Sequence, residues 1–296
     1  MVQDNKKSLI PHWVGNYPFA AGKKKPVLID RDKSVLFMYG QEHKVSCTTA
    51  ISTNYIQSGI MIIPPGEYFE PPDIHSGDEV YYVLNGEGAV LDPETGRAVK
   101  IKKGQVILIP KGIWHQAFNT CDENLEVLAF IAPLQWQKGH AEVPSEFTGE
   151  AAYYKGSKKQ IKGFGKWPDY SEVQNATNEI CVIKEENALG VIHGTTKHCL
   201  VSFYISNNNL HVGSYTLAAG FSTDMESHQG DEIIYLQEGH LGIETHEKIP
   251  TQEATINDIF EIKGGQFFLI PERTTHRYFN LSDQTLKVMF GVAPQL

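Results

Sequence analysis

One short pattern occurs twice in this chain and constrains the fold more than any other feature. Residues 73–79 read DIHSGDE and residues 226–232 read ESHQGDE, so each copy has an acid, a histidine two positions later and a glutamate four positions after that. Four residues of straight strand span about 13 Å, which is too far for the histidine and the glutamate to hold one ion at about 2.1 Å. The Gly-Asp pair between them is typical of a tight turn, so we expect the chain to turn there and bring the two side chains together.

A second pattern, also present twice, supplies another histidine. Residues 104–119 read GQVILIPKGIWHQAFN and residues 265–280 read GQFFLIPERTTHRYFN. The apolar run predicts a buried strand that ends at the proline, and the residues after it predict a turn that returns His115 or His276 on the neighbouring strand. Each half of the chain therefore offers two histidines and a glutamate as corners of one metal site.

Together the two patterns resemble the two motifs of the cupin superfamily, and their duplication resembles a bicupin. The matching positions are Gly66, His75, Glu79, Gly86, Gly104, Pro110, Gly112, His115 and Asn119 in the first copy and Gly220, His228, Glu232, Gly239, Gly265, Pro271, His276 and Asn280 in the second. The resemblance implies two tandem double-stranded β-helix (jelly-roll) barrels with a metal site inside each.

The chain departs from the usual cupin pattern at the first motif histidine. Asp73 stands there in the first copy and Glu226 in the second, and Arg273 replaces a usual glycine in the second copy. Each acid is either a further metal ligand, whose hard oxygen favours Mn or Fe over Cu, or a general base beside a bound substrate. The sequence leaves both roles open. The predicted metal set is Asp73, His75, Glu79 and His115 in one copy and Glu226, His228, Glu232 and His276 in the other.

The duplication extends well beyond the motifs. An offset of 154 residues aligns Ile29 with Ile183, and an offset of 161 carries the alignment from Gly104 and Gly265 to the Ala-Pro pairs at 132–133 and 293–294. The segments within each repeat are short and rich in Val, Ile, Tyr and Phe, with turn residues between them, as in an antiparallel sandwich or barrel. We therefore expect an all-β protein. Its predicted parts are an N-terminal arm over 1–26, a first cupin β-barrel over 27–135, a packed connector over 136–180 and a second cupin β-barrel over 181–296.

Composition narrows the range of partners. The formal net charge is −9 and the pI is near 5.7, and such a surface repels phosphate backbones and anionic lipid, so nucleic acid and membranes are poor partners. The N-terminus lacks the apolar stretch of a signal peptide, and the four cysteines form no CxxC pair. We expect a cytoplasmic protein that binds a small polar organic molecule, and a homo-oligomer is compatible with the sequence.

Ligand type guides the choice of metal and of chemistry. Two imidazoles and one carboxylate are the arrangement of non-haem Fe(II) oxygenases, so we favour Fe(II) or Mn(II), while Zn(II) and Ni(II) also fit. The first hypothesis is an oxidoreductase of the dioxygenase kind. The second is a sugar or sugar-acid isomerase, epimerase or lyase in which the metal is a Lewis acid and Asp73 or Glu226 moves a proton. The third is a cupin that binds a metal or a ligand without catalysis.

Overall fold

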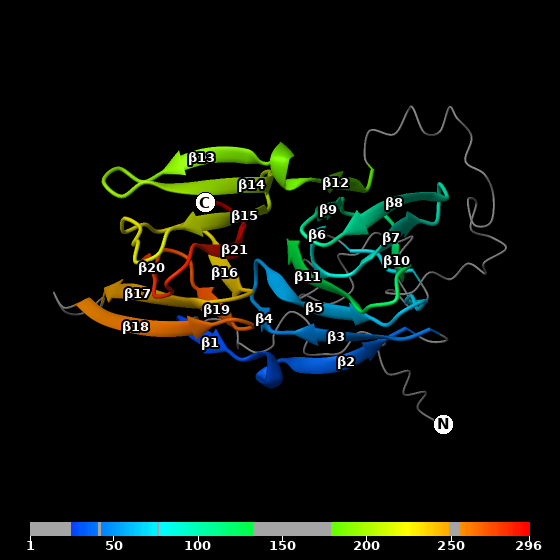
Figure 1. The fold of residues 1–296 in the computed structure, drawn as a ribbon, viewed down its shortest axis with the longest axis horizontal. Helices are drawn as coiled ribbons and strands as arrows, with labels where there is room; N and C mark the ends of the chain where they lie inside the picture. Colours follow the sequence, from blue (N-terminus) through cyan, green and yellow to red (C-terminus); the bar gives the residue numbers. More distant parts are fainter. Residues whose placement is uncertain (1–24, 41–42, 71, 76, 133–178, 249–254) are drawn as a thin grey trace, which may run out of the picture.

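The fold consists of two β-barrels side by side (Figure 1). The computed structural model describes residues 25–40, 43–70, 72–75, 77–132, 179–248 and 255–296. Each barrel pairs a large antiparallel sheet with a three-stranded sheet, which confirms the predicted all-β fold of two tandem jelly rolls. The predicted arm and connector lie almost wholly outside the described residues, and the predicted domain limits remain predictions.

Eleven strands build the N-terminal barrel: β2 (Val35–Tyr39), β3 (Val45–Thr49), β4 (Ile51–Ser52), β5 (Gln57–Ile63), β6 (Asp78–Asn85), β7 (Glu87–Asp92), β8 (Arg97–Lys102), β9 (Val106–Ile109), β10 (Gln116–Asn119), β11 (Leu125–Ala132) and β12 (Cys181–Ile183). Its large sheet has the order β12-β9-β6-β11-β5-β3-β2, with β4 also paired to β5, and its small sheet has the order β10-β7-β8.

Ten strands build the C-terminal barrel: β1 (Val27–Ile29), β13 (Leu189–His193), β14 (Cys199–Ser206), β15 (His211–Leu217), β16 (Asp231–Leu236), β17 (His240–Lys248), β18 (Thr255–Lys263), β19 (Phe267–Ile270), β20 (Thr275–Asn280) and β21 (Leu286–Ala293). The large sheet has the order β1-β19-β16-β21-β15-β14-β13, and the small sheet has the order β18-β17-β20. Two short 3-10 helices, η1 (Arg31–Lys33) and η5 (Glu185–Asn187), complete the described elements.

The first strand of each repeat belongs to the other repeat's barrel. β1 pairs with β19, with Val27 opposite Leu269, and β12 pairs with β9, with Cys181 opposite Leu108. β1 is therefore seen beside the C-terminal strands and β12 beside the N-terminal ones (Figure 1). This exchange was not predicted, because an edge strand joins a sheet through backbone hydrogen bonds that little in its own sequence specifies.

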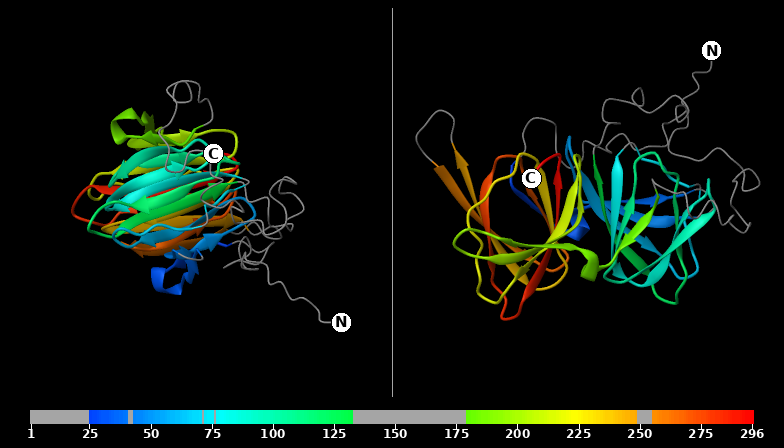
Figure 2. Two further views of the ribbon diagram at one scale, coloured as in Figure 1. Left: turned by 90° about the vertical axis from the view of Figure 1, so that its right-hand side faces the viewer. Right: turned by 90° about the horizontal axis from the view of Figure 1, so that it is seen from above.

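The strand that carries each motif glutamate is buried on both faces. In β6, Tyr81 and Val83 face the interior of the N-terminal barrel, while Val80, Tyr82 and Leu84 join a separate apolar cluster that includes residues of both barrels. A strand covered on both faces has a continuous apolar sequence instead of an alternating one, which explains the run VYYVL. The barrels seen from above in Figure 2 therefore share one apolar interface.

The motif asparagines close the loop that leads into the last strand of each repeat. Asn119 Nδ2 donates to Ile63 O at 2.8 Å and to Glu123 O at 2.6 Å. Asn280 Nδ2 likewise donates to Leu217 O at 2.9 Å. Both amides are buried, so these bonds satisfy backbone carbonyls that would otherwise lose water without a partner. Their part in the repeat is structural.

Within the described ranges, none of the helical segments has the length and apolar character that a membrane crossing requires.

The packing between the barrels can be tested by its contribution to stability. Phe130 is fully buried in β11, and a Cβ added at Gly291 of β21 would lie 2.5 Å from its ring, so the ring fills the space that this glycine leaves. We expect Phe130→Ala to lower the free energy of unfolding by about 3–5 kcal/mol, measured by urea denaturation. Ile259→Ala, at a side chain that is 73% exposed, is the control and should change it by less than about 0.5 kcal/mol. A loss below about 1 kcal/mol for Phe130→Ala would contradict the packing described.

Candidate metal centres

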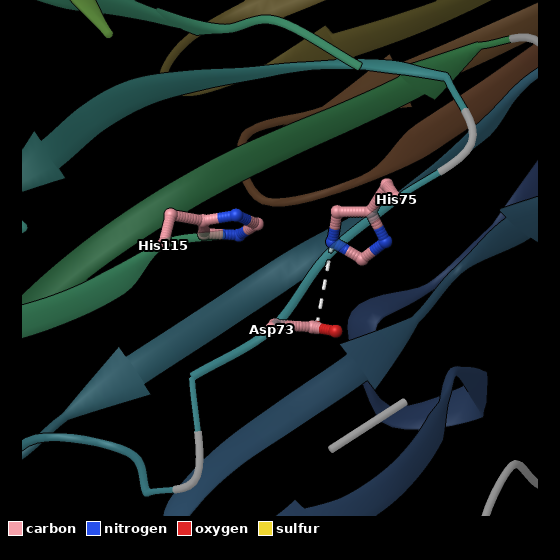
Figure 3. A group of neighbouring side chains, drawn as sticks. All are labelled: Asp73, His75 and His115. Carbon is pink, nitrogen blue, oxygen red and sulfur yellow. Dashed lines mark ion pairs between the residues drawn. The ribbon is translucent and has the colours of Figure 1, made fainter. Parts of the chain in front are cut away.

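Residues of both motifs meet inside the N-terminal barrel. Asp73 and His75 lie on the segment before β6, Glu79 is the second residue of β6, and His115 directly precedes β10. Asp73 and His115 form an isolated antiparallel bridge, in which Asp73 N donates to His115 O at 2.8 Å and His115 N donates to Asp73 O at 2.9 Å. The backbone thus joins the two motifs where their side chains converge (Figure 3).

The second-motif histidine does not return on the strand beside β9, so that prediction was wrong. β9 lies next to β6 in the large sheet, whereas β10 lies next to β7 in the small sheet. The residues from Pro110 to His115 cross from one sheet to the other. Glu79 and His115 therefore belong to opposite sheets, which lets them meet within the barrel.

The aspartate before each motif glutamate anchors the loop of the second motif. Asp78 Oδ1 accepts a hydrogen bond from Lys111 N at 2.9 Å, and Asp231 Oδ1 accepts one from Glu272 N at 2.9 Å. The aspartate of each Gly-Asp pair thus holds the loop that carries His115 or His276 close to the start of the glutamate strand.

The same loop also contacts the first-motif histidine through one residue in the left-handed region. Gly112 N donates to His75 O at 2.9 Å and Arg273 N donates to His228 O at 2.7 Å. Their φ angles are 74° and 62°, so the second copy keeps the backbone conformation although the usual glycine is absent. This conformation costs about 1 kcal/mol for a residue with a Cβ.

In the N-terminal barrel, four side chains bring their ligand atoms close together. Glu79 Oε2 lies 2.9 Å from His115 Nε2 and 3.2 Å from His75 Nε2, and Asp73 Oδ2 lies 3.4 Å from His75 Nε2. Asp73, His75 and His115 each offer a ligand atom within 4.8 Å of the others. Glu79 is nearer to His75 than Asp73 is, so we include it in the same group.

The C-terminal barrel repeats this geometry. Glu232 Oε2 lies 3.2 Å from His276 Nε2 and 3.3 Å from His228 Nε2. Glu226 Oε1 is farther away, 3.8 Å from His276 Nε2, although Glu226, His228 and His276 also offer ligand atoms within 4.8 Å of one another. The structure therefore brings together all the predicted site residues of each copy.

These short distances do not have the geometry of hydrogen bonds. Glu79 Oε2, His115 Nε2, Glu232 Oε2, His228 Nε2 and His276 Nε2 are all buried and have no hydrogen-bond partner among the described residues. Buried polar atoms without partners are rare in folded proteins. A cation bound among them would give each of these atoms a partner.

The other ring nitrogen of each second-motif histidine is already engaged. His115 Nδ1 lies 3.1 Å from Ile113 O, and His276 Nδ1 lies 2.9 Å from Thr274 O. A carbonyl only accepts, so Nδ1 carries the proton in both rings and Nε2 keeps a lone pair directed at the cluster. Backbone partners of this kind commonly orient metal-binding histidines.

Charge within the cluster favours a bound cation. Burial raises the pKa of Glu79, but the charges of His75 and His115 beside it outweigh burial, so the pKa falls to about 2. Burial lowers the pKa of His75, but Asp73 and Glu79 outweigh it and raise the pKa to about 9. For Glu232 the same balance of burial against histidine charge lowers the pKa. The carboxylates thus remain ionised and attract positive charge.

The residues fit a divalent ion on two counts. Two donors at 2.1 Å from one ion and at right angles are about 3.0 Å apart, which is close to the separations between Glu79 or Glu232 and their histidines. Two carboxylates with two neutral imidazoles carry a charge of −2, which a divalent cation cancels. The donors, nitrogen and oxygen without thiolate, suit Fe(II), Mn(II) and Zn(II).

One residue of the C-terminal site was missed in the sequence. His193 Nε2 lies 2.6 Å from Glu226 Oε2, although His193 belongs to neither of the two repeated patterns. Its contact comes from a strand 33 residues away, so motif spacing did not reveal it. The alignment of the two repeats could have drawn attention to His193. At an offset of 154 residues Gly40 aligns with Gly194, and His193 directly precedes Gly194.

Comparison with known proteins agrees with this fold. Residues 59–131 match the family described as Cupin domain. The N-terminal barrel thus contains a cupin domain, and the arrangement of two such barrels is that of a bicupin. No curated protein matches the sequence.

Several solved structures share the arrangement of both barrels. Oxalate decarboxylase of Lactobacillus farciminis, in a formate complex, has a TM-score of 0.65 at 14% identity, over 93% of this chain and 88% of that chain. The 11S globulin of Wrightia tinctoria has a TM-score of 0.63 at 16% identity, over 93% and 86%. AerE of Microcystis aeruginosa has a TM-score of 0.56 at 11% identity, over 88% and 97%. Identities this low establish the fold alone.

The two clusters can be tested separately by the metal content of single variants. We expect His115→Ala to remove one equivalent of bound divalent metal and His276→Ala to remove the other, because each imidazole belongs to a separate barrel. Elemental analysis of the purified variants measures this. His43→Ala, at a histidine paired with Glu67 outside both clusters, is the control and should keep both equivalents. Full metal content in either cluster variant would rule out its assignment.

Proposed function

We propose that this bicupin is a divalent-metal-dependent enzyme that acts on a small polar organic molecule. The observation that carries the proposal is the convergence of two imidazole nitrogens and one carboxylate in each barrel. Glu79 Oε2 and His115 Nε2 in one barrel, and Glu232 Oε2, His228 Nε2 and His276 Nε2 in the other, are buried and have no hydrogen-bond partner among the described residues. Two buried carboxylates are costly unless positive charge compensates them, and a bound divalent cation would supply that charge with both imidazoles as neutral ligands. The proposed residues are His75, Glu79 and His115 in one barrel and His228, Glu232 and His276 in the other.

The first candidate reaction is that of an oxidoreductase of the dioxygenase kind. A 2-His-1-carboxylate set leaves positions for both a substrate and oxygen, and bound Fe(II) would supply oxygen activation there. Glu79 and His115 belong to opposite sheets and are almost fully buried, so they supply a rigid, dry inner wall. His75 and Asp73 are 11% and 18% exposed, so the substrate reaches the site from their side.

The second candidate is a lyase, isomerase or epimerase, and the second acid favours it. Asp73 and Glu226 are more exposed than Glu79 and Glu232, so they lie nearer to an entering molecule. Burial raises the pKa of Asp73 despite the opposing charges of His75 and His115, and a raised pKa is the direction expected of a carboxyl that exchanges a proton with a substrate. The metal would serve as a Lewis acid.

Two structural neighbours bear on the choice of metal and on a third candidate function. One solved structure concerns the Mn(II) centres of Bacillus subtilis oxalate decarboxylase, at 13% identity, and it favours Mn(II) beside Fe(II) here. The 11S globulin structure reports an auxin binding site, which supports the third candidate, a ligand-binding cupin without catalysis.

Oxygen uptake separates the candidates. We expect protein stripped with a chelator and reloaded with Fe(II) to consume oxygen with one compound of a panel of dicarboxylic acids, 2-oxo acids, hydroxylated aromatics and aldoses. The rate should fall at least a hundredfold in the His115→Ala/His276→Ala double variant, since it lacks both centres. An oxygen electrode and product chromatography measure both quantities.

The other outcomes are equally informative. Metal-dependent turnover that is unchanged under nitrogen would replace the first candidate by the second. Ligand binding by calorimetry without any product would establish the third. Protein that binds neither Fe(II) nor Mn(II) would refute the proposal as a whole.

A further inference from the structure

The carboxylate of Glu226 has partners on both of its oxygens. His193 Nε2 lies 2.6 Å from Oε2, and the Tyr215 hydroxyl donates to Oε1 at 3.4 Å. The side chain of Glu226 is 10% exposed, whereas His193 is 42% exposed and Tyr215 is buried. Glu226 is therefore held between an inner phenol and an outer imidazole, with Oε1 on the side of His276.

A clamp on the following turn keeps His193 in place. Asp224 Oδ2 accepts hydrogen bonds from Thr195 N at 2.7 Å, Thr196 N at 2.7 Å and Thr195 Oγ1 at 3.1 Å. These bonds fix the chain directly after His193 and lower the pKa of Asp224 to about 2. Asp224 and Glu226 are two residues apart on one segment, so the segment that carries the site acid also fixes its outer partner.

The N-terminal barrel has different side chains at the equivalent positions. In β2 and β3, Tyr39 pairs with Val45 as His193 pairs with Cys199 in the second copy, so Tyr39 occupies the place of His193. The repeat offset places Met61 where the second copy has Tyr215. Methionine has no proton to donate, so Met61 cannot hold Asp73 as Tyr215 holds Glu226.

We infer that His193 is a positioning residue that fixes the Glu226 carboxylate at the C-terminal metal centre and makes this centre unlike the N-terminal one. The inference rests on the proposed metal function. An exposed ion pair contributes little, but here one partner is 90% buried and faces a cluster of ligand atoms. Loss of His193 frees the carboxylate to rotate away from His276, so the effect falls on metal affinity.

The test isolates the C-terminal centre by using the full-length His115→Ala variant as background. Mn²⁺ titration followed by electron paramagnetic resonance then reports one site. We expect His193→Ala to weaken Mn²⁺ binding about tenfold or more, as outer partners of metal ligands commonly do, and to change the Mn²⁺ spectrum. His193→Gln keeps an N–H donor for Glu226 and should stay within about threefold of the background. In a Glu226→Gln background, His193→Ala should add no further loss, because it acts through Glu226.

A second His–Glu pair of the same length gives the matched control. His246 Nε2 lies 2.6 Å from Glu244 Oε1 on β17, and His246 is 30% exposed. His246→Ala should leave the Mn²⁺ affinity unchanged. Unchanged affinity in His193→Ala, or an equal loss in His246→Ala, overturns the inference alone. A background protein that binds no Mn²⁺ overturns the proposed function as well.

Discussion

The structure depends on carboxylates buried inside two barrels. Glu79 and Glu232 are 4% and 0% exposed, and burying such a charge still costs several kcal/mol after the protein relaxes around it. In each barrel two imidazoles offset part of that cost. Each carboxylate stays buried because it lies on a strand that is covered on both faces. Exposing the carboxylate to solvent would require that strand to leave the sheet.

The local parts of the site were predictable, because they depend on residues that lie close together in the sequence. The Gly-Asp turn places His75 before β6 and Glu79 within it, and the proline after β9 starts the loop that delivers His115. The sheet to which β10 belongs was not predictable in the same way. Two barrel sheets present similar apolar strands, so the sequence of a strand shows that it is buried but does not show which sheet it joins.

Contacts between distant strands escaped prediction for a related reason. The exchange of β1 and β12 rests on backbone hydrogen bonds at sheet edges, and these carry little information in side chains. His193 meets Glu226 only because β13 runs alongside β14 at the edge of the large sheet. Duplication nevertheless offered a guide. Where two repeats share a backbone, positions at which they differ chemically, such as Tyr39 and His193, mark where the two centres can diverge.

One measurement tests the central claim most directly. Crystals of the full-length protein grown with Mn²⁺ and examined by anomalous X-ray scattering locate each ion without reference to activity. The account predicts one anomalous peak in each barrel, about 2.1 Å from two histidine Nε2 atoms and one glutamate oxygen: His75, His115 and Glu79, or His228, His276 and Glu232. No peak in either barrel, or peaks only at surface carboxylates, would contradict it.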